Sequence, residues 1–146
     1  MAETRELNAR ECEALLRHGT AGRAALSTPT GPHIVPVNYF VLDDAIIVRT
    51  SPYSMLGTYA RDSMLAFEID HVDPDLERGW SVQARGRVSV ITDSATLESL
   101  RAAAMPRPLV GGVRSLYLRM RWTELSGRQV GPRWNPLEDL DLAVGS

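Results

Sequence analysis

Apolar residues near the N-terminus recur at helical spacing. Over residues 12–16 they fall three and four positions apart, so they line one face of a helix. Asn8 and Glu11 have the spacing of a capping box that starts this helix, and Gly19 stands where a left-handed C-cap is common. The pattern predicts a short amphipathic helix with Cys12 on its apolar face.

From residue 21 onward the period changes to the alternation that is typical of strands. Pro36 lies inside the second predicted strand, where a missing amide donor is tolerated at a sheet edge or a bulge. Gly86 near the middle of a long strand predicts a bend or bulge. Short helices are predicted at 54–61 and 93–104, with Met105–Pro108 breaking the second. The predicted strands are 23–28, 34–42, 45–50, 64–70, 80–92 and 115–125.

Six strands in meander order, with short helices at the connections, predict a mainly β fold in which an antiparallel sheet closes into a barrel. A chain of 146 residues suits a single domain. We expect a lead-in helix within residues 1–20, the barrel over 21–128 and a C-terminal tail over 129–146, with a turn at Ser126–Gly127. The tail is rich in Pro, Asp and Glu and is expected to be loosely ordered.

Composition narrows the class of protein. A net charge of −2 and a pI near 5.9 argue against a nucleic-acid-binding surface, and no apolar run reaches the roughly 18 residues of a membrane span. No secretory signal is visible, so we expect a cytoplasmic protein that binds neither nucleic acid nor membrane. Cys12 is the only cysteine, which excludes an intramolecular disulfide and a cysteine-rich zinc site.

Most catalytic and metal-binding motifs are absent from the sequence. His18, His33 and His71 are scattered and lack carboxylate or cysteine partners at ligand spacing, so we expect no metal site. There is no Gly-x-Ser-x-Gly elbow, and no Gly-x-Gly-x-x-Gly follows a strand. The sequence therefore does not favour a hydrolase, a protease or a Rossmann dehydrogenase.

The first candidate for chemistry is the turn from Arg49 to Ser54, where a β-branched strand ends and a helix begins. Phosphate binding needs convergent donors, a positive charge and free helix amides. Arg49, Thr50, Ser51 and Ser54 supply side-chain donors of this kind, and Arg49 supplies the positive charge. The alternative is that Ser51 or Ser54 only caps the helix while Arg49 is solvated, and the spacing leaves both interpretations open.

Two further segments are candidates. In "HIVPVNYF", residues 33–40, Pro36 and Asn38 would leave main-chain groups unpaired at a surface, which a flat heterocycle could use. An ordinary edge strand with Asn38 in water explains the same pattern. In "GWSV", residues 79–82, Trp80 could form a ligand wall, although core or interface packing is the commoner role of such a tryptophan.

Taken in order, these segments resemble a known family. The pieces "GRAALST", "GPHIVPVNYFVLDDAIIVRTSPYSML", "MLAFEID" and "GWSVQARGRV" are similar to the small pyridoxamine 5′-phosphate oxidase-like proteins, which have an FMN-binding split β-barrel. The resemblance runs from about Gly22 to about Val90. The piece "ELSGRQV" is similar to the last strand of that family, though more weakly.

The resemblance implies a homodimer that binds two FMN molecules in grooves along the subunit interface. The edge strand would run beside the isoalloxazine ring and use its backbone there, and the turn after the third strand would reach the ribityl chain and the phosphate. The long strand would complete the wall, and an arginine of the first strand would lie on the phosphate side. The residues implied are Arg23, Pro36, Val37, Asn38, Tyr39, Arg49, Thr50, Ser51, Ser54, Met55, Trp80 and Ser81.

The turn departs from the family pattern at two positions. Many relatives read Arg-Thr-Ser-Pro-Gly-Ser-Lys-Leu, whereas this chain has Tyr53 for the glycine and Met55 for the lysine. A lost charge-assisted contact to phosphate costs about 1.5–3 kcal/mol. Arg23, Arg49 or Arg61 could compensate. Met55 leaves open weak FMN binding, a different cofactor, or a scaffold without a cofactor.

Three functions follow from the resemblance. The first is an FMN-dependent oxidoreductase that acts on a small molecule, in which the cofactor carries the chemistry. The second is a reductase that uses the deazaflavin F420 in the same groove. The third is a non-catalytic protein that binds a flavin or haem, or binds nothing. No residue stands out as a catalytic acid or base, and pyridoxamine phosphate oxidation itself is not expected, because the longer C-terminal segment of that enzyme has no counterpart here.

Overall fold

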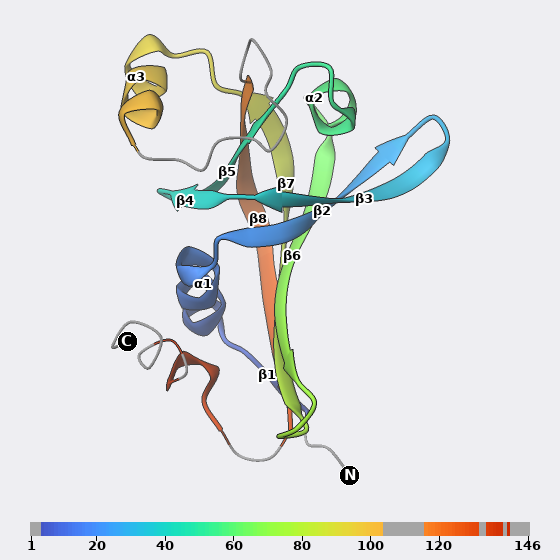
Figure 1. Ribbon diagram of the computed structural model, residues 1–146, viewed down its shortest axis with the longest axis vertical. Coiled ribbons are helices and arrows are strands. Elements are labelled where there is room, and N and C mark those ends of the chain that lie inside the picture. The colour runs from blue at the N-terminus through green and yellow to red at the C-terminus, as the bar shows by residue number, and fades with distance from the viewer. Residues whose placement is uncertain (1–3, 104–115, 132–133, 139, 141–146) are drawn as a thin grey trace.

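The computed structural model describes residues 4–103, 116–131, 134–138 and 140, and every structural statement below concerns these residues. They form a single antiparallel sheet with short helices packed against it (Figure 1). The elements in chain order are β1 Thr4–Glu6, α1 Ala9–His18, β2 Ala21–Thr28, β3 Gly31–Asn38, β4 Phe40–Leu42, β5 Ala45–Thr50, α2 Met55–Tyr59, β6 Met64–Asp73, β7 Arg78–Val90, α3 Ser94–Ala102 and β8 Leu116–Val130.

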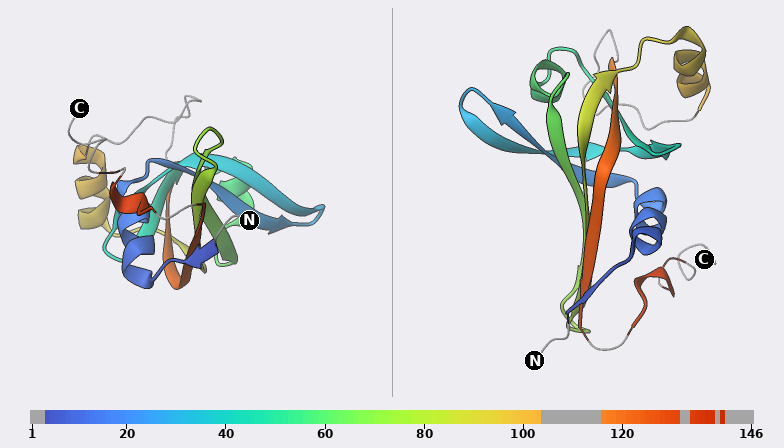
Figure 2. Two further views of the ribbon diagram at one scale, coloured as in Figure 1. Left: turned by 90° about the horizontal axis from the view of Figure 1, so that it is seen from below. Right: turned by 180° about the vertical axis from the view of Figure 1, so that it is seen from behind.

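The sheet has the strand order β3-β2-β6-β7-β8-β5-β4, and β1 pairs with the end of β8. It curls so that β3, on one edge, contacts β5 beside the other edge, as Figures 1 and 2 show. The predicted mainly β, split-barrel fold is confirmed. The predicted meander order is wrong, because β2 pairs with β6 and β5 pairs with β8. The barrel does not close through hydrogen bonds, because β3 and β4 remain the two edge strands of the described sheet.

The long strands β6, β7 and β8 define two ends of the molecule (Figure 1). Helices α2 and α3 lie at one end, near the last residues of β5 and β7. The hairpin between β6 and β7 lies at the other end, beside β1. Figure 2 shows the same long strands extending past α1. Successive residues of these strands point to opposite faces of the sheet, and the face toward α1 is called the inner face below.

The inner face carries the main core. Phe67, Ile46 and Val82 are fully buried there, and α1 adds Leu15 and Leu16 to the same cluster. The predicted helix is confirmed, with both halves of its capping box in place. The apolar stripe of α1 therefore fixes the helix against the inner face of the sheet.

The prediction of a left-handed C-cap at Gly19 is wrong. Gly19 has an extended backbone with φ −70° and ψ 160°. The residue is nevertheless constrained, because a Cβ at this position would collide with the Tyr39 hydroxyl group. That hydroxyl donates a 2.6 Å hydrogen bond to the carbonyl of Leu16. The glycine is needed for the close approach of Tyr39 and not for a positive φ.

Two strand predictions hold and two need correction. Pro36 does lie on an edge strand, and the register shift at Gly86 is the predicted bulge. The predicted strand 34–42 is divided at Tyr39 into β3 and β4. No turn forms at Ser126–Gly127, because β8 continues to Val130. Gly127 packs directly under α1, where a Cβ would meet the Cys12 sulfur, so the glycine allows helix–strand contact.

The predicted loose tail is also corrected for the part that the structure describes. The Trp134 carbonyl accepts a 2.8 Å hydrogen bond from the Gln129 side chain, and the Arg78 guanidinium lies 4.5 Å from the Trp134 ring centroid. Pro136 is fully buried, and Leu137 and Leu140 pack against the core. This segment folds back onto its own chain. The predicted helix break at Met105–Pro108 lies outside the described residues.

Candidate functional site

The turn after β5 is built around Ser54. Its hydroxyl accepts a 2.9 Å hydrogen bond from the Gly57 amide, which caps α2, and it lies 2.8 Å from the Ser51 carbonyl and 2.7 Å from the Thr50 hydroxyl. The capping interpretation of Ser54 is therefore correct. Ser51 accepts a 3.2 Å hydrogen bond from the Tyr53 amide. These contacts order the turn, and Thr50 is half-buried within it.

Basic groups near this turn have structural contacts of their own. The Arg49 guanidinium lies 5.8 Å from the centroid of the Tyr117 ring. Arg61 donates a 2.7 Å hydrogen bond to the carbonyl of Gly57. The side chains that the turn exposes most are Tyr53, at 92%, and Met55, at 39%. The outer surface of the turn is therefore aromatic and apolar where the family pattern has a glycine and a lysine.

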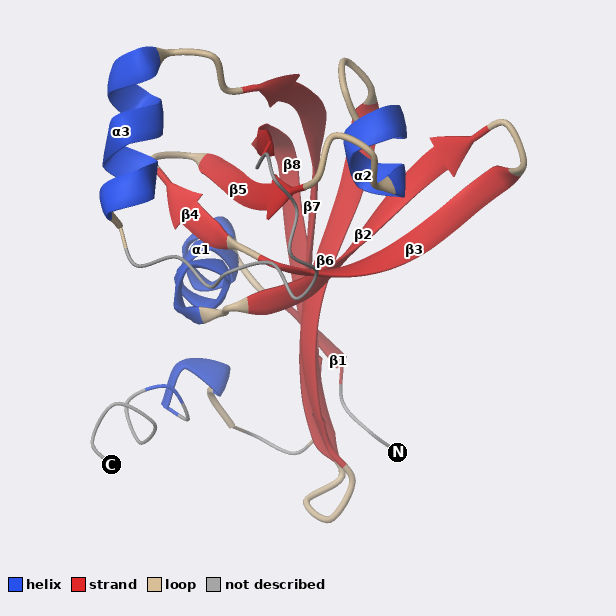
Figure 3. Cartoon of the chain, turned by 45° about the horizontal axis from the view of Figure 1, so that its top comes forward, coloured by secondary structure: helices blue, strands red, loops and turns tan. Residues whose placement is uncertain are grey.

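Strand β3 presents one main-chain edge on the other side of α2. Its residues alternate between half-buried and exposed, with Pro36 and Asn38 exposed and Val37 half-buried. Among the described strands β3 pairs only with β2. Figure 3 shows α2 above β2, so the turn before α2 and the β2–β3 hairpin share one end of the molecule. It is the hairpin end of β3, at Gly31, that lies toward α2, whereas Pro36 and Asn38 lie at the other end of the strand.

Tyr39 differs from its neighbours on β3. Its side chain is buried, with its ring centroid 4.8 Å from that of Phe67, and burial raises the pKa of the Tyr39 phenol. Its amide donates to the carbonyl of Thr20. The side chain of Tyr39 therefore belongs to the core, and its amide is bonded to the residue before β2, so neither reaches the surface.

Arg23 lies on the outer face of β2, opposite Pro36 in register. Its guanidinium donates to the Glu68 and Asp70 carboxylates of β6 at 3.0 Å each. The hydrogen bond with Asp70 raises the pKa of the Glu68 carboxyl, so the two acids compete for this one cation. The positive charge of Arg23 is thus directed at β6 and offset there.

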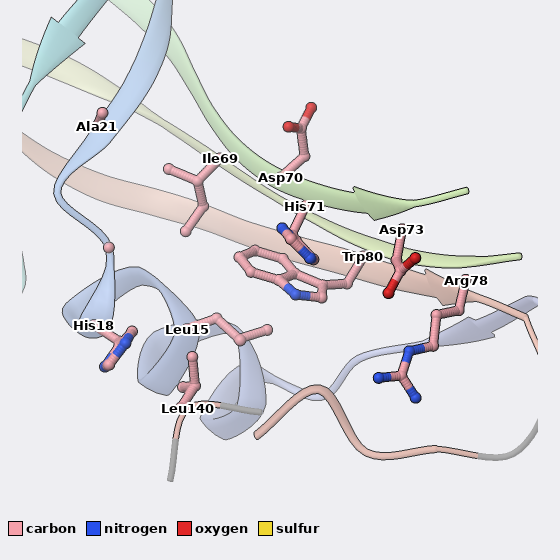
Figure 4. A pocket seen from close by; sticks show the side chains of 11 residues that line it. Leu15, His18, Ala21, Ile69, Asp70, His71, Asp73, Arg78, Trp80 and Leu140 are labelled. Carbon is pink, nitrogen blue, oxygen red and sulfur yellow. The ribbon is translucent and has the colours of Figure 1, made fainter. Parts of the chain in front are cut away.

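Trp80 and Ser81 are neighbours on β7, and Trp80 lines two cavities whereas Ser81 lines only one of them. Figure 4 shows Trp80 in the lining of an inner cavity of about 530 Å³ between α1, β6 and β7. Ser81 lines an outer cavity of about 320 Å³, to which Arg128 also contributes and which Trp80 touches as well. The pleat of the strand explains the division, because successive side chains point to opposite faces.

The predicted site residues form two groups far apart within one chain. Arg49 pairs with Tyr117 near the start of β8, whereas Trp80 pairs with Gln129 near its end. At about 3.3 Å per residue, these positions are separated by roughly 40 Å of strand. The structure places Trp80 and Ser81 at the opposite end from the turn, and Pro36–Asn38 lie between them, because Asn38 pairs with Ala21, which lines the same cavity as Trp80.

Sequence reasoning missed exposed apolar residues at both ends of the molecule. Val72 and Leu76, 69% and 51% exposed, lie at the β6–β7 hairpin, and we call them the hairpin patch. The only sequence signal is the pair of apolar residues, Val72 and Leu76, within the polar loop "HVDPDLERG". At the other end an α2 patch consists of Ile34, Tyr53, Tyr59 and Met64, which are 71%, 92%, 39% and 47% exposed.

Within the described ranges, no three His, Cys, Asp or Glu side chains are placed to hold a metal ion. Over the same residues, no helix has the length and apolarity needed to cross a bilayer.

Comparison with known proteins decides the family. The model of the pyridoxamine 5′-phosphate oxidase family matches residues 8–129. The chain belongs to that family. The uncharacterized protein Rv0080 of Mycobacterium tuberculosis is 32% identical over 96 residues, which span 62% of this chain and 63% of that protein.

Solved structures agree on the fold. An FAD-binding protein of Mycobacterium smegmatis has a TM-score of 0.76 and 29% identity, over 88% of this chain and 100% of its own. An FAD-binding protein of Mesorhizobium loti has a TM-score of 0.70 and 19% identity, over 90% of this chain and 100% of its own. Solved FAD-binding proteins therefore share the split-barrel fold of this chain.

Proposed function

We propose that this chain is a flavin-binding oxidoreductase that works as a homodimer on a small molecule. The observation that carries the proposal is the exposed edge of β3, which contacts β5, the strand that leads into the turn at Thr50. An extended main chain offers alternating donors and acceptors, which suit the polar edge of a flat heterocycle. The 29% identical FAD-binding protein supports a flavin in particular.

The residues of this region fit a flavin in part. Residues 35–38 of β3 supply main-chain groups for the ring, and Thr50 and Arg49 supply a hydroxyl and a charge nearby. A bound flavin provides hydride chemistry. The part of this chain would be to orient the ring and to shield one of its faces from water. No side chain of the turn or of β3 is proposed as an acid or base.

Met55 bears on which flavin is bound. FMN ends in a phosphate monoester that carries up to two negative charges, as phosphorylated side chains do. Each phosphate of a pyrophosphate diester carries only one, so FAD has less need of a lysine at position 55. FMN remains the cofactor predicted from the sequence, and FAD is the alternative that Met55 and the FAD-binding relative favour.

A homodimer would explain the two distant groups of site residues. In an antiparallel two-fold pair the hairpin patch of one chain would lie against the α2 patch of the other. This arrangement would cover both exposed apolar patches at once. The same arrangement would bring Ser81 and the outer cavity of one chain to the turn of its partner. Each flavin site would then contain residues of both chains.

The decisive experiment is the visible spectrum and sedimentation of the purified protein, before and after titration with FMN, FAD and F420. We expect a dimer that carries a flavin band as isolated or acquires one at micromolar flavin. A dimer that binds F420 but no flavin would replace the proposal with a deazaflavin reductase. A dimer that binds none of the three would overturn both enzyme functions and leave a binding protein or a scaffold without a cofactor.

A further inference from the structure

The inner cavity at Trp80 lies on the face of β6 and β7 toward α1, and the proposed flavin site does not include its α1 wall. It measures about 530 Å³, within the usual range for sites that hold small molecules. Figure 4 shows the Trp80 indole in the middle of the lining, with Leu15 and Leu140 on the α1 side and Ile69 and His71 on the side of β6.

The helix wall of this cavity is held by contacts that do not depend on a ligand. The Tyr39 hydroxyl bonds to the carbonyl of Leu16 at 2.6 Å, near the end of α1. At the start of the helix the Arg5 guanidinium donates to both carboxylate oxygens of Glu11, at 3.1 and 2.7 Å. Helix α1 is therefore fixed at both ends beside the cavity.

The wall formed by the C-terminal segment is held just as firmly. Gln129 is the one buried polar side chain of the described structure, and it joins Arg5 at 2.8 Å to the carbonyl of Trp134 at 2.8 Å. The Trp134 indole nitrogen donates to the carbonyl of Val130 at 3.4 Å. The Arg78 guanidinium lies over the Trp134 ring. The cavity is thus preformed and does not depend on induced closure.

The lining combines an aromatic surface with hydrogen-bonding groups. Trp80 is only half-buried, and Ile69 and Leu15 are buried beside it. His71 and Asp73 follow at alternate positions of β6 and so share the inner face, and His18 belongs to the lining at the end of α1. Carboxylate and imidazole together can accept from a ligand and donate to it.

The lining has no excess of positive charge. Asp70 shares Arg23 with Glu68, at 3.0 Å each, and Asp73 and Arg78 are the other opposite charges of the cavity. Such a lining does not attract an anion, and burying an unpaired charge is costly. The site therefore favours an uncharged ligand.

We propose that this cavity is a second binding site for a small uncharged planar heterocycle, next to the outer cavity, with which it shares Trp80 and Asp73. The ring stacks on the Trp80 indole, and its polar edge reaches His71 and Asp73. A base-like ring suits this lining because every such ring has a π-face for the tryptophan and a mixed donor and acceptor edge for the two polar side chains.

The test uses the purified full chain, in flavin-free and flavin-treated forms, with adenine, pterin and indole as planar probes and cyclohexanol as a non-planar control. Binding is measured by ligand-observed NMR and by quenching of tryptophan fluorescence. We expect at least one planar probe to bind with a Kd of about 1 mM or tighter, and cyclohexanol not to bind at that concentration. Because the flavin-free form is measured, the outcome does not depend on the proposed flavin function.

Variants then locate the site. Trp80→Leu should weaken binding of the planar probe by at least about fivefold, the loss of one stacking contact, and Trp80→Phe should restore most of it. Asp73→Asn should weaken the probes that donate hydrogen bonds and spare those that do not. Trp122→Leu is the matched control, since Trp122 does not line the cavity, and it should leave the Kd unchanged. Circular dichroism and thermal melts confirm that each variant is folded.

The proposal is overturned if no planar probe binds to the folded protein at 1 mM. It is also overturned if a probe binds but folded Trp80→Leu and Trp122→Leu weaken it equally, because the site would then lie elsewhere. A probe that binds wild type, loses affinity with Trp80→Leu and regains it with Trp80→Phe supports it.

Discussion

The proposed shared site predicts that two defective variants complement each other. Arg49→Glu reverses the charge beside the turn, and Ser81→Phe fills part of the outer cavity near the hairpin. These positions are separated by roughly 40 Å of strand within one chain. If each flavin site takes the turn from one chain and the Ser81 region from its partner, both variants alone lose flavin.

The expected recovery follows from the symmetry of the dimer. When equal amounts of the two variants are unfolded together and refolded, random pairing makes about half of the dimers mixed. In each mixed dimer one site receives both altered residues and the other receives neither. The mixture should therefore bind flavin at about a quarter of the wild-type sites, while each variant refolded alone binds almost none.

Flavin bound per chain is measured from the visible band after removal of free cofactor, and sedimentation confirms that the mixture is dimeric. Thermal melts of the separate variants control for misfolding. A dimeric mixture that binds no more flavin than the mean of the two variants would show that the sites are not shared, and would refute the antiparallel arrangement. Full binding by Ser81→Phe alone would remove the outer cavity from the site.

Three further predictions concern single residues. Met55→Lys should tighten FMN binding about tenfold relative to FAD. A charge-assisted contact is worth roughly 1.5–3 kcal/mol, and we expect the lower end because position 55 is partly exposed. An unchanged ratio of the two affinities in flavin titrations would place residue 55 away from the phosphate. Tyr39→Phe leaves the carbonyl of Leu16 without its 2.6 Å partner and should lower the free energy of unfolding by about 1–3 kcal/mol. Calorimetry should show a lower Tm, and the flavin stoichiometry should be unchanged. An unaltered Tm would contradict the buried hydrogen bond. The hydrogen bonds from Arg5 lower the pKa of the Glu11 carboxyl, so its contribution to stability is present above the unfolded value of about 4.3 and is lost as the pH falls through the folded value. Glu11→Gln should remove that part of the acid dependence of Tm, and identical acid curves would contradict it.

Local patterns in the sequence determined the parts of this protein that depend on near neighbours. The capping box at Asn8 and the apolar face of α1 are complete within a few residues of each other, and both formed as predicted. The same is true of Pro36 on an edge strand, because proline lacks the amide donor that an interior strand needs for its ladder of hydrogen bonds. Ser54 as a helix cap follows from the same local chemistry.

Other features depend on which distant segments meet. Gly19 was read as a left-handed cap, but its role comes from Tyr39, which lies far along the chain. Strand β8 continues through Ser126–Gly127 because β7 pairs with it and α1 covers Gly127, and neither partner is visible in the local sequence. The described C-terminal segment is ordered by Gln129 and Arg78 for the same reason.

The site shows the same division. The sequence by itself identified the turn, the edge strand and Trp80 as candidates, and the residue types were sufficient for that. Only the tertiary structure separated Trp80 from the turn by the length of β8 and placed Trp80, but not Ser81, in the lining of the inner cavity. Strand length and pleat set both results, because a residue's face and its distance from another element are fixed only once the register of the sheet is fixed.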